Sequence, residues 1–220
     1  MNIVEPDKWK ADKIRAQMDY HMFLAHALAV NACHELVKDG KVELAEGFGY
    51  ANMDKQVKRG YNEYIRLDEG IGKDAMMDVA LLVMEDGDTW SCEEPEKEVA
   101  ALVFDGKCTI KWEDQSYDVD RPNPFDYNPS CLHVCKGVKF EIIAHGPCNI
   151  YIQKTLNEKT FPSKMYKPED TDTWARGNKG ELMGCIKRDV RTCFDLDNAP
   201  YSNMVLGEVV NLPGKWSSYP

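Results

Sequence analysis

From about residue 61 onward, the sequence consists of short apolar or alternating segments separated by turn residues. The segments are 61–67, 77–84, 98–104, 107–112, 116–119, 138–144 and 149–153. Asp105-Gly106 separates two of them and predicts a hairpin turn, and His145-Gly146-Pro147 predicts another turn. Short strands at this spacing are typical of a β-sandwich or barrel, and a jelly roll fits best. The expected fold class is therefore mainly β.

The N-terminal part has a helical pattern instead. Apolar residues recur at three- and four-residue steps from Asp7 to about Lys38, which predicts one amphipathic helix followed by the stop signal Gly40. Its histidines, His21, His26 and His34, do not have the i, i+4 spacing of a helical metal site. We interpret residues 1–60 as a helical extension and 61–155 as a first β domain.

The C-terminal part contains too few strands for a second β domain. Residues 156–184 are polar and rich in proline and glycine, so we interpret them as a connection. Strand patterns return at 185–194 and 203–211, but two strands and a turn cannot close a β core. Residues 185–220 are therefore expected to be the first strands of an incomplete second domain. An open edge near Val205 to Val210 favours pairing with another chain, hence a possible homodimer.

Charge and composition exclude several partners. The chain has 27 Lys and Arg against 37 Asp and Glu, a net charge of −10, which repels nucleic acid. No run approaches the roughly 18 apolar residues of a membrane span. The first residues lack the basic and then apolar pattern of a secretory signal. Eight cysteines without such a signal indicate reduced thiols, so we expect a cytoplasmic protein.

One close pair of cysteines has a histidine between its members. Cys131 and Cys135 have no second pair at zinc-site spacing, so zinc is not indicated. His133 near these thiols suggests a Cys/His nucleophile pair. Packing of small buried thiols in a strand explains the same pattern.

The C-terminal sequence Gly-Lys-Trp-Ser-Ser-Tyr-Pro, at residues 214–220, resembles the middle of the 5-deoxy-glucuronate isomerase family, as do 188–191 and 206–213 before it. These are bicupin enzymes of inositol catabolism, related to 5-keto-4-deoxyuronate isomerases. Residues 87–106 and 121–126 resemble the family's first cupin more loosely. The resemblance covers about 61–220. It implies a first, degenerate cupin (jelly-roll) barrel followed by the start of a second, truncated cupin.

The resemblance also implies an activity and a metal. Family members are aldose–ketose isomerases that convert 5-deoxy-glucuronate to 2-deoxy-5-keto-gluconate. Their metal ligands lie in the second cupin, where a His-x-His segment is expected just after the Tyr-Pro pair. The sequence ends at Pro220, so no metal ligand or catalytic residue is assigned here. We expect no cofactor in this chain, a divalent Zn or Mn ion in a complete family member, and no activity from this chain alone.

The first cupin lacks the general metal motif. Gly87 and five further residues are followed by Glu93, Glu94 and Pro95 where His-x-His is expected. Glu98 stands near the acidic position, and Phe140 stands at the third imidazole. Because a divalent transition metal favours imidazole ligands, we expect this barrel to act as a scaffold.

Substrate contacts are predicted near the C-terminus. Arg188 and Arg191 could hold a uronate carboxylate bidentately, although solvated strand arginines explain them equally well. The candidate residues beside the expected site are Trp216, Ser217, Ser218 and Tyr219. The first alternative function is a non-catalytic cupin that binds a sugar acid or a protein partner. The second is an activity of the first cupin itself, carried by Glu93, Glu94 and Glu98.

Overall fold

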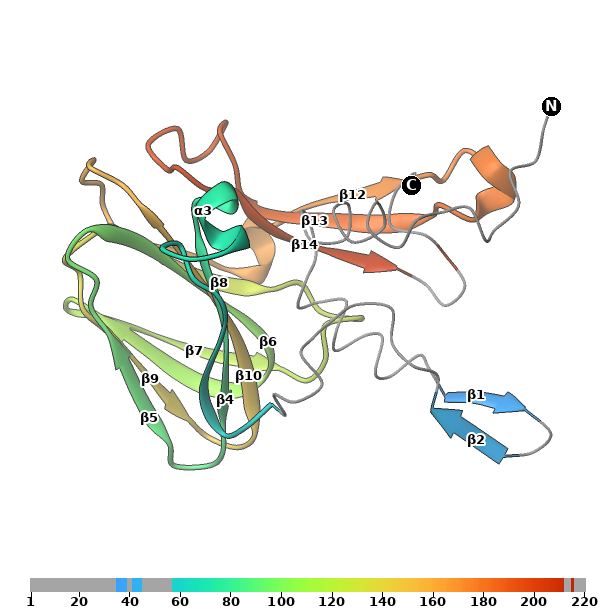
Figure 1. The fold of residues 1–220 in the computed structure, drawn as a ribbon, viewed down its shortest axis with the longest axis horizontal. Helices are drawn as coiled ribbons and strands as arrows, with labels where there is room; N and C mark the ends of the chain where they lie inside the picture. Colours follow the sequence, from blue (N-terminus) through green and yellow to red (C-terminus); the bar gives the residue numbers. More distant parts are fainter. Residues whose placement is uncertain (1–34, 39–40, 45–56, 212–214, 216–220) are drawn as a thin grey trace. The chain divides into compact units, whose positions relative to one another are not determined.

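The computed structural model describes residues 35–38, 41–44, 57–211 and 215 (Figure 1). Strands β1 (Glu35–Lys38) and β2 (Lys41–Leu44) form an antiparallel hairpin. Most of the helix predicted over 7–38, namely residues 7–34, lies outside the described residues. Its last four residues are strand β1, so the predicted helix is wrong there. Val37 pairs with Val42 in the hairpin, and β-branched residues favour strands over helices.

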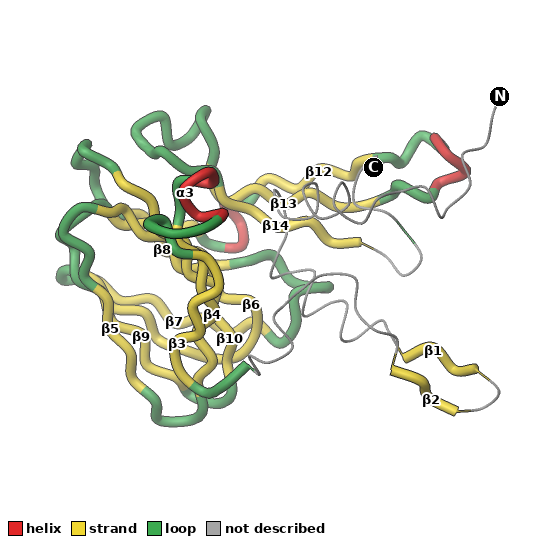
Figure 2. The backbone as a smooth tube through the Cα atoms, in the orientation of Figure 1, coloured by secondary structure: helices red, strands yellow, loops and turns green. Residues whose placement is uncertain are grey.

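Residues 57–174 and 189–210 form one compact unit, a β barrel built from antiparallel strands (Figure 2). Its strands are β3 (Gly60–Ile65), β4 (Asp78–Met84), β5 (Thr89–Cys92), β6 (Lys97–Trp112), β7 (Gln115–Arg121), β8 (Ser130–Val134), β9 (Phe140–Ala144), β10 (Cys148–Leu156) and β11 (Lys164–Tyr166). The first layer has the order β11-β8-β6-β10-β4-β3. In the second layer β7 and β9 pair with the far half of β6, and β5 pairs with β9. The mainly β class is confirmed.

Strand β6 belongs to both layers. The sequence predicts a hairpin at Asp105-Gly106, but β6 continues through these residues from Lys97 to Trp112, so the hairpin is wrong. Ile150 pairs with Val103 and Asn149 pairs with Asp105, which leaves Phe104 as an extra residue without a partner on β10. Such a bulge bends a strand without ending its pairing. The Asp-Gly signal marks this bend.

The bulge changes which residues of β6 face the barrel interior. The apolar core contains three odd-numbered residues before the bend, Val99, Ala101 and Val103, and three even-numbered residues after it, Cys108, Ile110 and Trp112. Side chains alternate between the two faces of a strand, so one extra residue shifts the inward set by one position. Glu98 and Ala100 consequently lie on the outer face of β6.

The outer face of β6 and β8 is also buried. The ring of His133 on β8 stacks on Phe194 at 4.2 Å between centroids, and Tyr166 stacks on Phe194 at 5.3 Å. Phe194 ends strand β13 (Arg188–Phe194), which lies in a three-stranded sheet between β12 (Asp172–Arg176) and β14 (Leu206–Asn211). Segments that follow the barrel in sequence therefore pack against it.

The stretch predicted as a connection contains regular structure. Strand β11 pairs with β8, with Met165 opposite Leu132, and extends the first layer. Two short helices, η2 (Pro168–Asp170) and η3 (Glu181–Gly184), also lie in this stretch, and the short helix α3 (Ile71–Ala75) precedes β4. Strand β11 has only three residues, too few for a periodic pattern to show. Among the described residues, no helix has the length and apolar character needed to span a membrane.

We predict that Gly106→Ala weakens the barrel more than Gly87→Ala. Both glycines have positive φ, 100° and 81°, which costs an alanine about 1 kcal/mol. A Cβ at Gly106 would also collide with the Pro147 carbonyl oxygen and Cys148, whereas one at Gly87 would meet nothing within 4 Å. In urea unfolding we expect a loss of about 3 kcal/mol or more for Gly106→Ala. Equal losses for the two variants would show that the bend is not sterically constrained.

Candidate functional site

The Lys154 ammonium, at an inward position of the barrel, lies beside the side chains of Tyr61, Cys92 and Glu94, and Trp90 stacks on Tyr61. We call these residues, with Lys154, the Lys154 cluster. Strand β10 directs Cys148, Ile150 and Ile152 into the apolar core, and Lys154 follows at the next inward position. The Lys154 Nζ donates a hydrogen bond to Glu94 Oε1 at 2.6 Å. The two side chains are 11% and 24% exposed.

Aromatic rings join this ammonium to the core. The Lys154 Nζ lies 5.1 Å from the centroid of the Tyr61 ring, a cation–π distance. The Tyr61 ring stacks on Trp90 at 5.5 Å with an interplanar angle of 8°. Trp90 in turn meets Phe140 edge to face at 5.8 Å. The Tyr61 ring therefore contacts both the Lys154 ammonium and the Trp90 ring, so its faces are not free to stack on a ligand.

The cluster holds its proton-bearing groups in their protonated forms. Burial alone would lower the pKa of Lys154, but the hydrogen bond to Glu94 and the neighbouring groups raise it above its ordinary value. Burial raises the pKa of Tyr61 to about 12 and that of the Cys92 thiol to about 11, although Lys154 acts against both shifts. At neutral pH the groups are thus an ammonium, a phenol and a thiol. Neither Lys154 nor Cys92 is activated as a nucleophile.

The cluster lies where the general cupin motif would place its metal ligands, near residues 93–95 and Phe140. Cys92 pairs with Phe140, the residue that stands at the third imidazole position. The inward side chains near the end of β5 are Cys92 and Glu94, whereas Glu93 is exposed. Glu98 lies on the outer face of β6 and does not join them.

These residues do not fit a transition metal. The described part of the chain contains no group of three or more His, Cys, Asp or Glu side chains placed to hold a metal ion. The Lys154 ammonium lies against Glu94, and Phe140 supplies no donor atom. A divalent cation would meet a like charge at this place. We therefore assign no metal-dependent step to the first barrel.

A buried carboxylate–imidazole pair lies on the other face of the sheet. His133 Nε2 and Glu98 Oε2 are 2.8 Å apart, and both side chains are fully buried. Glu98 also accepts hydrogen bonds from Ser202 Oγ at 3.0 Å and from the Asn203 backbone N–H at 2.6 Å. Glu98 thus connects β6 and β8 to the segment before β14.

This arrangement favours packing over nucleophilic catalysis at Cys131 and His133. Burial, and the neighbouring Cys193, raise the pKa of the Cys131 thiol well above its ordinary value. Cys131 and His133 are both completely buried. Sequence patterns could not pair His133 with Glu98, because 35 residues separate them along the chain.

The two arginines predicted to contact substrate have different surroundings. Arg191 is buried and donates to Glu208 at 2.9 Å and to the backbone carbonyls of Pro124 and Phe125 at 2.7 and 2.8 Å. Arg121 donates to the same Glu208 carboxylate at 2.6 Å. These contacts hold the 122–129 loop against β13 and β14. Arg191 is thus largely committed to protein acceptors.

Arg188 is less constrained. It is half-buried, and its Nη1 donates to the Ile186 carbonyl at 3.1 Å. The other four predicted contacts, Trp216, Ser217, Ser218 and Tyr219, lie outside the described residues. Of the six predicted substrate contacts, the structure therefore places only Arg188 and Arg191, both on strand β13.

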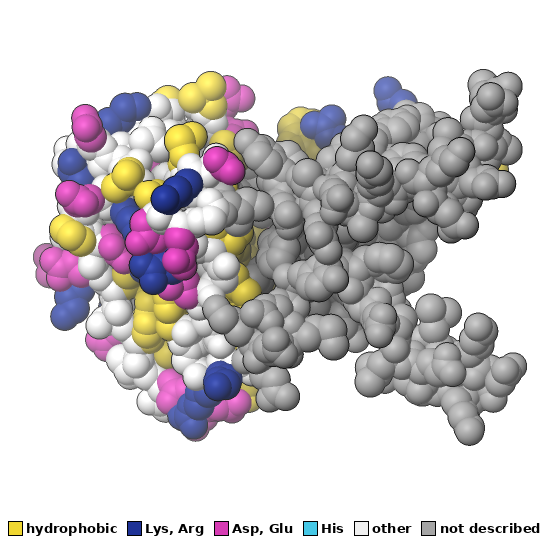
Figure 3. Space-filling model, in the orientation of Figure 1, with side chains coloured by type: hydrophobic (Ala, Val, Ile, Leu, Met, Phe, Trp, Pro, Cys, Tyr) yellow, Lys and Arg dark blue, Asp and Glu magenta, His cyan; other side chains and the backbone are white. Residues whose placement is uncertain are grey.

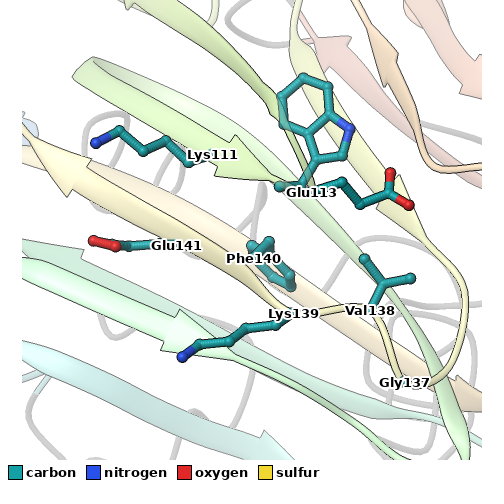
Figure 4. A pocket seen from close by; sticks show the side chains of 8 residues that line it. Lys111, Glu113, Gly137, Val138, Lys139, Phe140 and Glu141 are labelled. Carbon is teal, nitrogen blue, oxygen red and sulfur yellow. The ribbon is translucent and has the colours of Figure 1, made fainter.

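A shallow depression of about 500 Å³ lies beside the start of β9. Trp112, Val138 and Phe140 are its apolar residues, and charged side chains form its rim (Figure 4). Lys111, Lys139 and Glu141 extend to one side of it, with the carboxylate between the two ammonium groups in this view. Acidic and basic side chains are also interspersed over the visible barrel face (Figure 3). The depression has no dominant charge that would select a ligand.

Comparisons with known proteins agree on one family. Residues 52–220 match the model of the KduI/IolB family. The chain is 24% identical over 143 residues to 5-deoxy-glucuronate isomerase of Bacillus subtilis strain 168, covering 64% of this chain and 51% of that enzyme. It is 25% identical over 137 residues to the Bacillus velezensis enzyme of the same name, covering 61% and 49%. The chain thus spans about half the length of these curated relatives.

A solved structure has a similar fold. The crystal structure of an IolB-like protein from Salmonella typhimurium LT2 matches with a TM-score of 0.56 at 13% identity, covering 64% of this chain and 52% of that one. This likeness shows the fold, a cupin barrel, and agrees with the expected fold class.

We predict that Glu208→Gln destabilises the protein strongly. The substitution leaves two buried guanidinium groups without their shared carboxylate, and breaking a buried pair costs about 3–5 kcal/mol. Asp120→Asn is the matched control, because it breaks an ion pair with Lys107 that is exposed to solvent. The Lys107 and Asp120 side chains are 61% and 58% exposed. That control should change the unfolding free energy by no more than about 0.5 kcal/mol. Similar chemical denaturation midpoints for the two variants would contradict the role given to Glu208.

Proposed function

We propose that this chain, which belongs to the KduI/IolB family, forms the scaffold barrel of an aldose–ketose isomerase that acts on a deoxy-uronate. The observation that carries the proposal is the family match over residues 52–220, together with curated relatives named as isomerases. The substrate we propose is 5-deoxy-glucuronate, with 2-deoxy-5-keto-gluconate as product. We propose with it a role in inositol catabolism.

The reaction sets chemical requirements that the first barrel does not meet. An aldose–ketose isomerase removes a proton from carbon next to a carbonyl and stabilises the resulting enediolate. A divalent metal, when bound in a complete family member, supplies Lewis-acid stabilisation of that charge. In this barrel the Lys154 ammonium is paired with Glu94, and Glu98 is buried against His133. We therefore propose that the 220-residue chain is inactive alone and that its barrel supplies a rigid support.

The proposed ligand of the chain is a sugar acid. Arg188 is the better of the two candidate contacts with the uronate carboxylate, because Arg191 already serves Glu208 and backbone carbonyls. The seven cysteines that the structure describes are all free thiols, which supports a reducing compartment such as the cytoplasm.

The alternative function is a non-catalytic cupin that binds a sugar acid or a protein partner. The apolar filling of the barrel and the internally neutralised Lys154 cluster favour this alternative, because neither offers a reactive group. The two functions predict different results when this chain is joined to the C-terminal half of a curated relative. An isomerase scaffold should support turnover in such a fusion, whereas a binding module should not.

We predict no uronate isomerase turnover from this chain in the presence of Mn²⁺ or Zn²⁺. Product formation from 5-deoxy-glucuronate would be followed by NMR, with the Bacillus subtilis enzyme as positive control. A fusion of this chain to the C-terminal half of that enzyme should gain activity if the barrel is an isomerase scaffold. Activity of the chain alone would contradict the proposal, and a folded but inactive fusion would favour the binding alternative.

We also propose that the chain forms a dimer. Among the described residues, strand β14 lies at the edge of its three-stranded sheet, and an edge strand offers backbone groups to another chain. Sedimentation velocity should show a dimer that dissociates on dilution. A monomer at every concentration tested would contradict this prediction.

A further inference from the structure

Two strands of the barrel lie next to each other without sharing a ladder of backbone hydrogen bonds. Among residues 57–211, β3 ends the first layer and pairs only with β4, and β5 ends the second layer and pairs only with β9. Side chains join the two strands instead, through the contacts Arg59–Asp88 and Tyr61–Trp90. In both contacts the partner lies 29 positions further along the chain, so β3 and β5 run in the same direction. We call this junction the β3–β5 seam.

The contacts that close the seam are individually weak. Arg59 Nε donates to Asp88 Oδ2 at 2.7 Å, but these side chains are 61% and 27% exposed, and exposed ion pairs stabilise little. The Tyr61 and Trp90 rings are only half-buried, and they stack at 5.5 Å. Strand β10, by contrast, pairs with β4 and with β6 along most of its length. The seam thus lacks the backbone ladders that hold the centre of the sheet together.

The polar groups of the Lys154 cluster lie next to the seam. The Lys154 Nζ lies 5.1 Å from the Tyr61 ring and donates to Glu94, which follows β5. Cys92 lies on β5 two residues after Trp90, belongs to the apolar core and is 8% exposed. Parting of β3 from β5 would separate the two stacked rings. It would expose the ammonium, the carboxylate and the thiol to solvent.

We propose that the barrel opens at the β3–β5 seam: the two strands part while the rest of the barrel stays folded, and the Lys154 cluster becomes accessible to water and small solutes. Proteins open locally where few buried contacts hold a segment, at a lower free energy than global unfolding. The ladders of β10 with β4 and β6 persist in this opening, because none of their pairs crosses the seam. The opening goes beyond the proposed function and does not depend on the substrate of the chain.

The cysteines of the chain can report this opening. Wild-type protein is treated with a maleimide under native conditions, and mass spectrometry follows the labelling of each thiol. Burial raises the pKa of the Cys92 thiol to about 11, so the closed barrel holds little of the reactive thiolate. Cys131, on β8, is completely buried away from the seam and reports global unfolding. Cys92 should react at least about tenfold faster than Cys131, since local opening requires less free energy than global unfolding.

Two variants weaken the seam itself. Arg59→Gln removes the ion pair with Asp88 and should raise the labelling rate of Cys92 about threefold. Trp90→Leu keeps an apolar side chain but removes the stacked ring, and should raise that rate about tenfold. Both changes act on the closed state, so they increase the population of the open one.

Two controls separate opening of the seam from general loosening. Cys135 is 7% exposed, close to the exposure of Cys92, but it follows β8 rather than β5. Its labelling rate should be the same in wild type and in both seam variants. Lys107→Gln breaks an exposed ion pair with Asp120, between β6 and β7, and should leave the labelling rate of Cys92 unchanged.

Two results would overturn the proposed opening. Equal labelling rates of Cys92 and Cys131 in wild type would show that the barrel opens only by global unfolding. A Cys92 rate that neither seam variant changes would show that the thiol reacts without parting of the strands. The wild-type comparison and Arg59→Gln, an exposed side chain, decide the matter even if Trp90→Leu does not fold. None of these results affects the proposed function, which is tested by turnover of the fusion.

Discussion

The bend in strand β6 at Asp105 and Gly106 is the constraint on which the barrel depends. One continuous strand of 16 residues supplies pairing partners for β8 and β10 before the bend and for β7 and β9 after it. Because the bulge adds one residue, the inward set changes from odd to even positions. Without it, half of β6 would turn polar side chains into the core.

The inner and outer faces of the barrel sheet carry two kinds of buried chemistry. The barrel core is apolar, and two lysine–carboxylate pairs, Lys154 with Glu94 and Lys97 with Asp78, lie partly buried beside it. Outside, on the other face of the same strands, buried polar groups hold later segments in place. Glu98 fixes the segment before β14, and Glu208 joins Arg121 and Arg191 beneath the 122–129 loop. Polar networks thus position the C-terminal segments, while apolar packing closes the barrel.

Sequence patterns predicted the strands well and their long-range partners poorly. Period-two alternation and turn residues located β3, β4, β7, β9 and β10, because these are local properties. The Asp-Gly pair predicts a hairpin turn, since nothing local distinguishes a tight turn from a bulge that pairs with a strand more than 40 residues away. The C-terminal similarity identified the family, but four of its six predicted contacts lie outside the described residues.

The candidate site shows the same limit. An inward lysine could have been recognised from sequence, because Lys154 continues the even-numbered series from Cys148 on β10. Its partner Glu94 is 60 residues away, and the pairing of Glu98 with His133 was equally inaccessible. The cupin motif marks the right region, but its two histidine positions are one residue away from the inward Cys92 and Glu94, because the end of β5 has no local sequence signal.

We propose that the first barrel is a support whose internal cation is the Lys154 ammonium. Anomalous X-ray diffraction from crystals grown with excess zinc is the sharpest test. We predict that the Lys154 ammonium remains hydrogen-bonded to Glu94 and that no anomalous peak appears beside Cys92. A peak between Cys92 and Glu94, with Lys154 displaced toward solvent, would contradict it.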